Sequence, residues 1–321
     1  MEHYDLITVS SPHFHDNSSS RGIMLDVILA LLPAVGASIY IFGIKALWLI
    51  FTCVASCVAS EWIFDLCTKK KETIGDLSAV VTGVLLALNL GTEVALYEAV
   101  IGSVFAIVFV KCIFGGLGKN FANPAITARV FMLIAFGSVT SFVNPQLRTV
   151  EIASSATPLA NLASHSLDVL SSGVLPPIKD MLFGFHGGTI GETCIIALVI
   201  GWIYLSAKKV IKWYVPASFI ATVYVLFLVA TGSPLFALYE ILSGGLFLGA
   251  IFMATDYVTT PITVKGKVVF CVCCGVITFI IRRFCSLPEG VSFSILIMNI
   301  LTPFIEKLTH NVPLGGSNNG K

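Results

Sequence analysis

Long apolar runs dominate this sequence and constrain its fold more than any other feature. Ten such runs lie between residues 23 and 305, and polar connections separate them. A helix needs about 20 apolar residues to cross the hydrocarbon core of a bilayer. Only 12% of the residues are charged, whereas soluble domains have about a quarter. The chain is therefore predicted to be an all-α polytopic membrane protein in a lipid bilayer, and its net charge of +1 argues against nucleic acid as a partner.

The apolar runs predict about ten transmembrane helices, of which several are short. The predicted spans are residues 23–44, 46–67, 76–91, 95–114, 125–143, 190–206, 210–231, 235–254, 267–281 and 290–305. Short segments interrupted by glycine or proline in both halves are typical of inverted-repeat membrane proteins with discontinuous helices. We therefore predict a five-plus-five inverted repeat with short or broken helices.

Charge predicts the orientation and the division of the chain. With a cytoplasmic N-terminus, 14 of the 19 lysine and arginine residues fall on the inner side, as the positive-inside rule requires. The predicted parts are a cytoplasmic segment (1–22), a first five-span half (23–143), an external loop (144–189), a second five-span half (190–306) and a cytoplasmic tail (307–321). The N-terminal segment lacks the pattern of a cleaved signal peptide, so we expect it to be retained.

Several polar residues in or beside the spans are candidates for a cofactor or ion environment. Asn123 and Arg129 follow a glycine-rich connection, where a helix N-terminus is able to hold an anion; the alternative is a tight capped turn. Asp256 ends an apolar run, where a carboxylate is either functional or the cap of the next turn. Glu192 opens the sixth span and is a candidate pocket wall.

Other polar residues and the cysteines receive structural interpretations. Glu61 lies four residues before Asp65 and close to the lysines at 69–71, which favours a salt-bridged helix end over a cation pathway. The nine cysteines lie within apolar runs or at their ends and are interpreted as small buried hydrophobes. No metal site is assigned.

Four stretches of the chain carry a family resemblance. They are GGLGKNFANPAITARVF (115–131), SSATPLA (154–160), FMATDYVTTPITVKGK (252–267) and IIRRFCSLPEGVSFSILIMNILTPFIE (280–306). Together they resemble the D subunits of Rnf electron-transport complexes, and they are also similar to the B subunits of sodium-translocating NADH:quinone reductases. The resemblance extends from about residue 22 to residue 307.

The resemblance implies a covalent flavin. Family members carry FMN that is joined through its phosphate to a threonine hydroxyl and installed from FAD by a flavin transferase. On this chain the acceptor would be Thr157. In the family's flavinylation signature Glu151 stands where aspartate is usual, Ser154 and Ala156 match, and Ser155 replaces glycine. A second, noncovalent flavin, riboflavin or FMN, is also implied, without a place in the sequence.

The resemblance further implies a membrane subunit of a ferredoxin:NAD oxidoreductase that relays electrons coupled to H⁺ or Na⁺ translocation. Such a subunit is part of an enzyme and not a complete catalyst alone. Its partners would be the iron–sulfur, NADH-binding and second flavin subunits, in a bacterial or archaeal cell membrane. The alternatives are a solute channel or secondary transporter without flavin, a scaffold subunit that has lost its flavin, and the B subunit of a quinone reductase.

Overall fold

The computed structural model describes residues 19–69, 74–142, 157–163, 168–171, 173–285 and 289–309, and every regular element within them is helical. The elements are α1 (Ser20–Phe42), α2 (Ile44–Thr68), η1 (Ile74–Asp76), α3 (Ser78–Leu88), α4 (Leu96–Val104), η2 (Phe105–Cys112), α5 (Pro124–Ala135), η3 (Gly137–Thr140), α6 (Pro158–Leu162), α7 (Asp168–Ser171), α8 (Ile178–Phe183), α9 (Ile195–Ala207), α10 (Tyr214–Thr231), α11 (Pro234–Leu242), α12 (Leu246–Leu248), η5 (Gly249–Met253), α13 (Val264–Phe284) and α14 (Val291–Leu308). The all-α polytopic prediction is confirmed.

Each of the ten predicted spans contains a helix, but the helices differ in length. Five of those described, α1, α2, α10, α13 and α14, are long and apolar enough to cross a membrane. A sixth span is formed if α11 is joined to Leu246–Met253, although the two parts are bent by 66°. The helices α3, α5 and α9 have 11, 12 and 13 residues. At 1.5 Å per residue they measure roughly 16–20 Å, well short of the ~30 Å hydrocarbon core.

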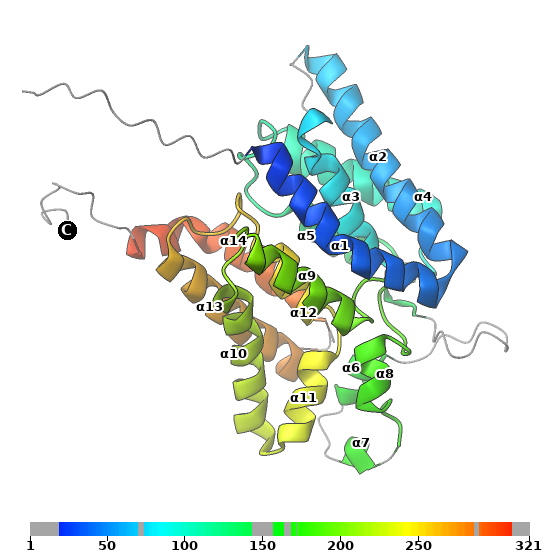
Figure 1. Cartoon of the computed structure of the whole chain (residues 1–321), viewed down its shortest axis with the longest axis vertical. Helices are drawn as coiled ribbons and strands as arrows, with labels where there is room; N and C mark the ends of the chain where they lie inside the picture. Colours follow the sequence, from blue (N-terminus) through cyan, green and yellow to red (C-terminus); the bar gives the residue numbers. More distant parts are fainter. Residues whose placement is uncertain are drawn as a thin grey trace, which may run out of the picture.

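The short helices differ in burial, since α3 is buried along almost its whole length whereas α9 has an exposed face with Ile200 and Ile203. Figure 1 shows α1 beside α9, with α2, α3 and α4 on one side and α10, α11 and α13 on the other. The contact between α1 and α9 is close, because a Cβ atom on Gly201 would lie 2.4 Å from the carbonyl oxygen of Ala30. The C-terminal part of the predicted external loop forms α8, which packs against α9 and α11.

Two non-helical segments, one just after α3 and one shortly before α9, pair through their backbones in the interior. Ile190 N–H donates to the carbonyl of Leu90, and Gly191 N–H donates to the carbonyl of Leu88, both at 2.9 Å. Only glycine fits at 191, since a Cβ there would lie 2.4 Å from Leu88 Cβ. These bonds satisfy backbone groups in the apolar interior, where an unpaired group costs several kcal/mol. Broken helices are therefore confirmed, whereas the five-plus-five inverted repeat stays a prediction.

Two π-helical segments interrupt the bundle. The first, η2, continues directly from α4, and the second, η5, continues from α12. π-Helical turns often occur at functional sites because they turn a side chain out of the regular helical register. Lys111 lies on η2 and Met253 ends η5, and each side chain lines an interior cavity.

Three basic residues that the charge count assigned to the two sides of the membrane are buried in the structure. Lys111 and Arg129, within predicted spans, and Arg282, just after one, are 1%, 2% and 3% exposed. Each has an acidic partner inside the bundle. Removing these three from the count leaves the charge bias in the same direction, and the orientation itself stays a prediction.

Candidate functional site

Two interior cavities collect the four polar residues that the sequence singled out. Asn123 and Asp256 line the first cavity together with Lys111, which we call the Lys111 cavity. Arg129 and Glu192 line the second, which we call the Arg129 cavity. Residues far apart in sequence are thus paired by the fold, but the four do not form one site.

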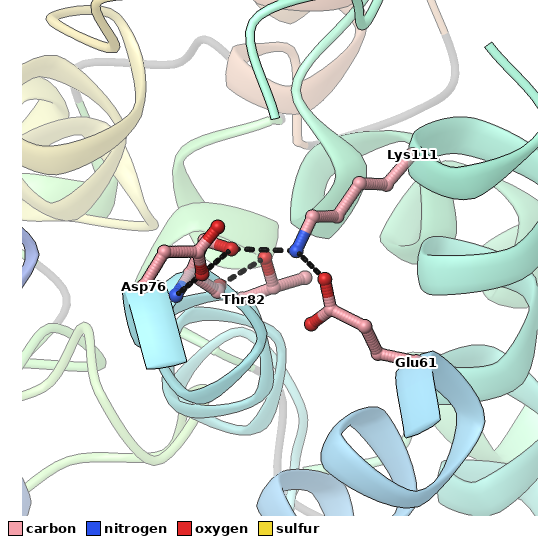
Figure 2. Close-up of polar contacts among 5 residues, drawn as sticks. Glu61, Asp76, Thr82 and Lys111 are labelled. Carbon is pink, nitrogen blue, oxygen red and sulfur yellow. Dashed lines mark hydrogen bonds and ion pairs between the residues drawn. The ribbon is translucent and has the colours of Figure 1, made fainter. Parts of the chain in front are cut away.

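An ionic cluster lies beside the Lys111 cavity, and its lysine and glutamate are each only 1% exposed. The Lys111 ammonium lies 2.6 Å from Glu61 Oε1 and donates to the Ser78 hydroxyl at 2.5 Å. Ser78 Oγ in turn donates to Asp76 Oδ1 at 2.5 Å. Figure 2 shows the Lys111 ammonium between the Glu61 carboxylate and the start of α3, where Asp76 and Thr82 lie. One cation is therefore connected to two carboxylates, one directly and one through a hydroxyl.

Local sequence fixes the position of each member of this cluster. Asp76 also accepts from the Ser78 N–H at 2.8 Å, so its carboxylate caps the start of α3. Leu77 has a positive φ of 64°, which makes the turn between η1 and α3 tight. Lys111 reaches the cluster from the π-helical η2 and Glu61 from α2. Glu61 thus has a cationic partner on another helix, whereas the lysines at 70 and 71, part of the predicted salt-bridged helix end, lie outside the described residues.

Asn123 and Asp256 act as caps at the edge of the same cavity. Asn123 Oδ1 accepts from the Ala125 N–H at 3.0 Å at the start of α5. Asp256 accepts from the Val258 N–H at 3.4 Å and from the Thr259 hydroxyl at 3.0 Å. The capping alternatives thus describe the contacts of both side chains, although both still face the cavity.

The Arg129 cavity is lined by two guanidinium groups, those of Arg129 and Arg282. Arg129 forms an ion pair with Glu289, which lies just before α14. Arg282 donates to the Glu240 carbonyl at 2.6 Å, to Glu240 Oε2 at 3.3 Å and to the Ser243 carbonyl. The Arg129 cavity has a volume of about 10 Å³, which is enough for a single water molecule.

Glu192 lies in the wall of the Arg129 cavity, as the sequence predicts. Its Oε1 accepts from the Thr189 N–H at 3.1 Å, so the carboxylate also closes the turn that precedes α9. Arg129 and Arg282 line the same space. The cavity therefore joins acidic and basic groups from both predicted halves of the chain.

Thr157 lies apart from both cavities, at the start of α6. Its half-buried Oγ1 accepts from the Ala160 N–H at 3.2 Å. Beside it, Pro158 and Asn161 line an open pocket with Phe185, His186 and other residues before α9. The signature residues Glu151, Ser154, Ser155 and Ala156 lie outside the described part of the chain.

His186 is buried where this pocket meets the bundle. Its Nδ1 lies 3.0 Å from the Gly187 carbonyl oxygen. Burial lowers the pKa of the His186 imidazole, and hydrogen bonds to the Gly187 and Thr193 backbone and the Asp180 charge oppose that shift. The ring is therefore held in its neutral form more strongly than a histidine in water.

Cysteines and acids do not assemble into a metal site in the described residues. No group of three or more His, Cys, Asp or Glu side chains there is close enough to hold an ion. Cys271 and Cys274 have the C-x-x-C spacing on α13, but both are buried, and burial of this kind suits small apolar side chains.

Sequence reasoning missed the partners of the buried charges. Lys111 lies within the predicted span 95–114. Because a charge inside a span is by default functional, the sequence did contain a signal that Lys111 is a candidate site residue. Glu289 and Arg282 flank predicted spans, and nothing in the linear sequence pairs them with Arg129 and Glu240. Only the packing of separate helices brings these groups together.

Long apolar helices, half-length helices and buried ion pairs in one all-α bundle are typical of a multi-pass integral membrane protein with polar sites in its interior. Comparison of the sequence with known families gives a narrower result. The chain belongs to the NQR2, RnfD, RnfE family, whose model matches residues 7–315.

Curated relatives support this assignment over nearly the whole chain. The chain is 43% identical to the D subunit of the Na⁺-translocating ferredoxin:NAD⁺ oxidoreductase complex of Acetobacterium woodii, with 96% of this chain and 95% of the relative covered. It is 39% identical to the D subunit of the proton-translocating ferredoxin:NAD⁺ oxidoreductase complex of Clostridium ljungdahlii, with 95% of each covered. It is 35% identical to the D subunit of the ion-translocating oxidoreductase complex of Stutzerimonas stutzeri, with 95% of this chain and 94% of the relative covered.

Proposed function

We propose that this chain is the D-type membrane subunit of a ferredoxin:NAD oxidoreductase and carries covalent FMN on Thr157. In this role it relays electrons, coupled to H⁺ or Na⁺ translocation. The observation that carries the proposal is the 43% identity to a relative of this name over 96% of the chain. The proposed partners are iron–sulfur, NADH-binding and second flavin subunits, together with a flavin transferase.

The surroundings of Thr157 are compatible with a flavin. Because Oγ1 accepts a hydrogen bond from Ala160, its own proton is free to be replaced by a phosphoryl group. The adjacent pocket of about 250 Å³ is lined by the polar residues Asn161 and Asp180, and its partly exposed Phe185 ring is suited to stacking. When bound, FMN would supply the redox chemistry, and these residues would orient it.

The buried charges support a part in ion translocation. Ionisable groups at membrane depth are costly and are typical of ion and proton pathways. The clusters around Lys111 and Arg129 contribute groups of both signs in the bundle interior. A second, noncovalent flavin belongs to the proposal as well, but the Lys111 cavity, at about 70 Å³, and the smaller Arg129 cavity assign no place to it.

In-gel flavin fluorescence tests the covalent attachment. The full chain is expressed with its flavin transferase, denatured, separated by electrophoresis and examined under ultraviolet light. We expect a fluorescent wild-type band, a dark Thr157→Ala band and a fluorescent Thr140→Ala band. Thr140 is a matched control because it is an exposed threonine that the flavinylation signature does not include.

Two results would contradict parts of the proposal. A dark wild-type band, with the transferase active on a control substrate, would exclude covalent FMN and favour a channel, transporter or scaffold. A fluorescent Thr157→Ala band would move the attachment to another residue. Ferredoxin-dependent NAD reduction in membranes then separates a flavin carrier from a scaffold, since only the carrier loses activity with Thr157→Ala while assembly is retained.

A further inference from the structure

A basic pocket lies where three helices end, away from Thr157 and next to the Lys111 cavity, with which it shares Val210, Ile211, Thr255 and Tyr257. It has a volume of about 220 Å³ and is lined by the 209–212 connection before α10 and by the start of α13. Lys209 and Lys212 contribute from that connection, and Lys267 contributes from the first turn of α13. Since α10 and α13 are both long enough to span a membrane, their ends mark the interface between the bilayer and water.

The described part of the chain does not neutralise the three lysines of this pocket. Among the described residues, no carboxylate lies within 4.0 Å of their ammonium groups, whereas the neighbouring Lys208 has Asp26 at that distance. The nearby acids have other contacts: Asp256 accepts from Thr259, and Glu306 accepts from the Ile262 N–H. The N-termini of α10 and α13 add positive partial charge on the same side. The pocket is therefore suited to an anion.

The ligand that fits this pocket also has an apolar part. Ile262 and Val264 line the pocket and are 84% and 42% exposed. Trp213, next to Lys212, is 65% exposed, and tryptophan is enriched at the level of lipid headgroups. Lys267 lies 5.4 Å from the centroid of the Tyr257 ring, which leaves its ammonium at the pocket rather than in solvent. The pocket thus places lysines beside apolar side chains. This combination suits an amphiphile with an anionic headgroup.

We propose that this pocket binds the phosphate headgroup of an anionic phospholipid. Lys209, Lys212 and Lys267 hold the phosphate, and the acyl chains run over Ile262 and Val264. Basic pockets between membrane helices recognise anionic headgroups in this way. The inference rests on the geometry of the pocket and not on the proposed redox function.

Native mass spectrometry of the full chain in detergent tests the site. Phosphatidylglycerol and phosphatidylcholine are titrated separately into wild type, Lys212→Gln/Lys267→Gln and Lys208→Gln. We expect wild type to bind phosphatidylglycerol more tightly than phosphatidylcholine. Each interfacial lysine contributes roughly fivefold to such binding, so the double variant should bind about thirtyfold more weakly. Lys208→Gln removes the same charge from the same connection but outside the pocket, and should bind like wild type.

A competition arm separates a lipid from a free anion. Inorganic phosphate at millimolar concentration should displace little phosphatidylglycerol, because it lacks the apolar contacts. Equal binding of the two lipids, unchanged binding by the double variant, or complete displacement by inorganic phosphate would each overturn the proposal. Far-ultraviolet circular dichroism of the double variant establishes that a loss of binding reflects the pocket and not unfolding.

Discussion

The Lys111 ammonium lies 2.6 Å from Glu61 Oε1, although 50 residues separate them in sequence, and both side chains are only 1% exposed. The pair joins the π-helical η2 to α2 in the buried interior of the bundle. Two charges in this position stabilise each other only as long as both are present. The packing of η2 against α2 therefore depends on the presence of both the lysine and the glutamate.

Removing one member of the Lys111–Glu61 pair should destabilise the protein more than removing both. Lys111→Met leaves Glu61 buried beside Asp76 without its cation, at a cost of about 3–5 kcal/mol. Lys111→Met/Glu61→Gln should recover part of that loss. Thermal unfolding in detergent measures the difference. Lys119→Met, at an exposed lysine, is the control and should change little; a double variant less stable than Lys111→Met would contradict the dependence on matched charge.

Arg282 should not be replaceable by lysine, although the adjacent Arg283 should be. Arg282 donates to the Glu240 carbonyl, the Glu240 carboxylate and the Ser243 carbonyl, and an ammonium cannot reproduce that planar arrangement. Arg282→Lys should lower the free energy of unfolding by about 2 kcal/mol, the scale of a hydrogen bond to a charged group. The same thermal measurement on Arg283→Lys, half-exposed beside it, provides the comparison. Equal stability of the two variants would count against this role of Arg282.

Gly191→Ala should disrupt the junction between α3 and the segment before α9. The new methyl group would lie 2.4 Å from Leu88 Cβ and 2.8 Å from the Leu88 carbonyl oxygen. Overpacking of this kind costs about 1–3 kcal/mol, and here it also strains the backbone bond to Leu88. The melting temperature should fall, whereas Gly137→Ala should not lower it, since a Cβ at 137 meets nothing within 4 Å. A Gly191→Ala protein as stable as wild type would show that this contact relaxes freely.

The stability of the protein should fall in mild acid because of His186. Its pKa in the folded state lies below the ordinary value of 6.5, chiefly because of burial. As the pH falls through 6.5, the unfolded chain binds a proton that the folded chain does not, so folding loses stability until the pH passes the lower folded pKa. Melting temperatures at pH 7.5 and 5.5 measure the loss, which should be smaller in His186→Gln. An equal loss in both proteins would assign the acid sensitivity to other groups.

The sequence and the structure agree most closely where a single helix suffices to define a feature. Each of the ten apolar runs contains a helix in the described residues, and capping was the structural alternative for Asn123, whose side chain accepts from the Ala125 N–H. The pairing of Arg129 with Glu289 could not be predicted from the sequence, because it depends on how α5 and α14 pack. The same holds for the pair of Glu61 and Lys111, which joins two helices that are 50 residues apart in the sequence.

What the sequence determined by itself is the class of the protein. Continuous apolar runs of about 20 residues are typical of membrane spans, and a single run of this length satisfies its own backbone hydrogen bonds in a bilayer by forming a helix. What only the tertiary structure decided is where helices stop short and which charges meet. The ends of α3 and α9 are fixed by the backbone bonds of Gly191 and Ile190 to a distant segment. A buried charge is stable only beside its partner, and that partner is chosen by packing in three dimensions, not by spacing along the chain.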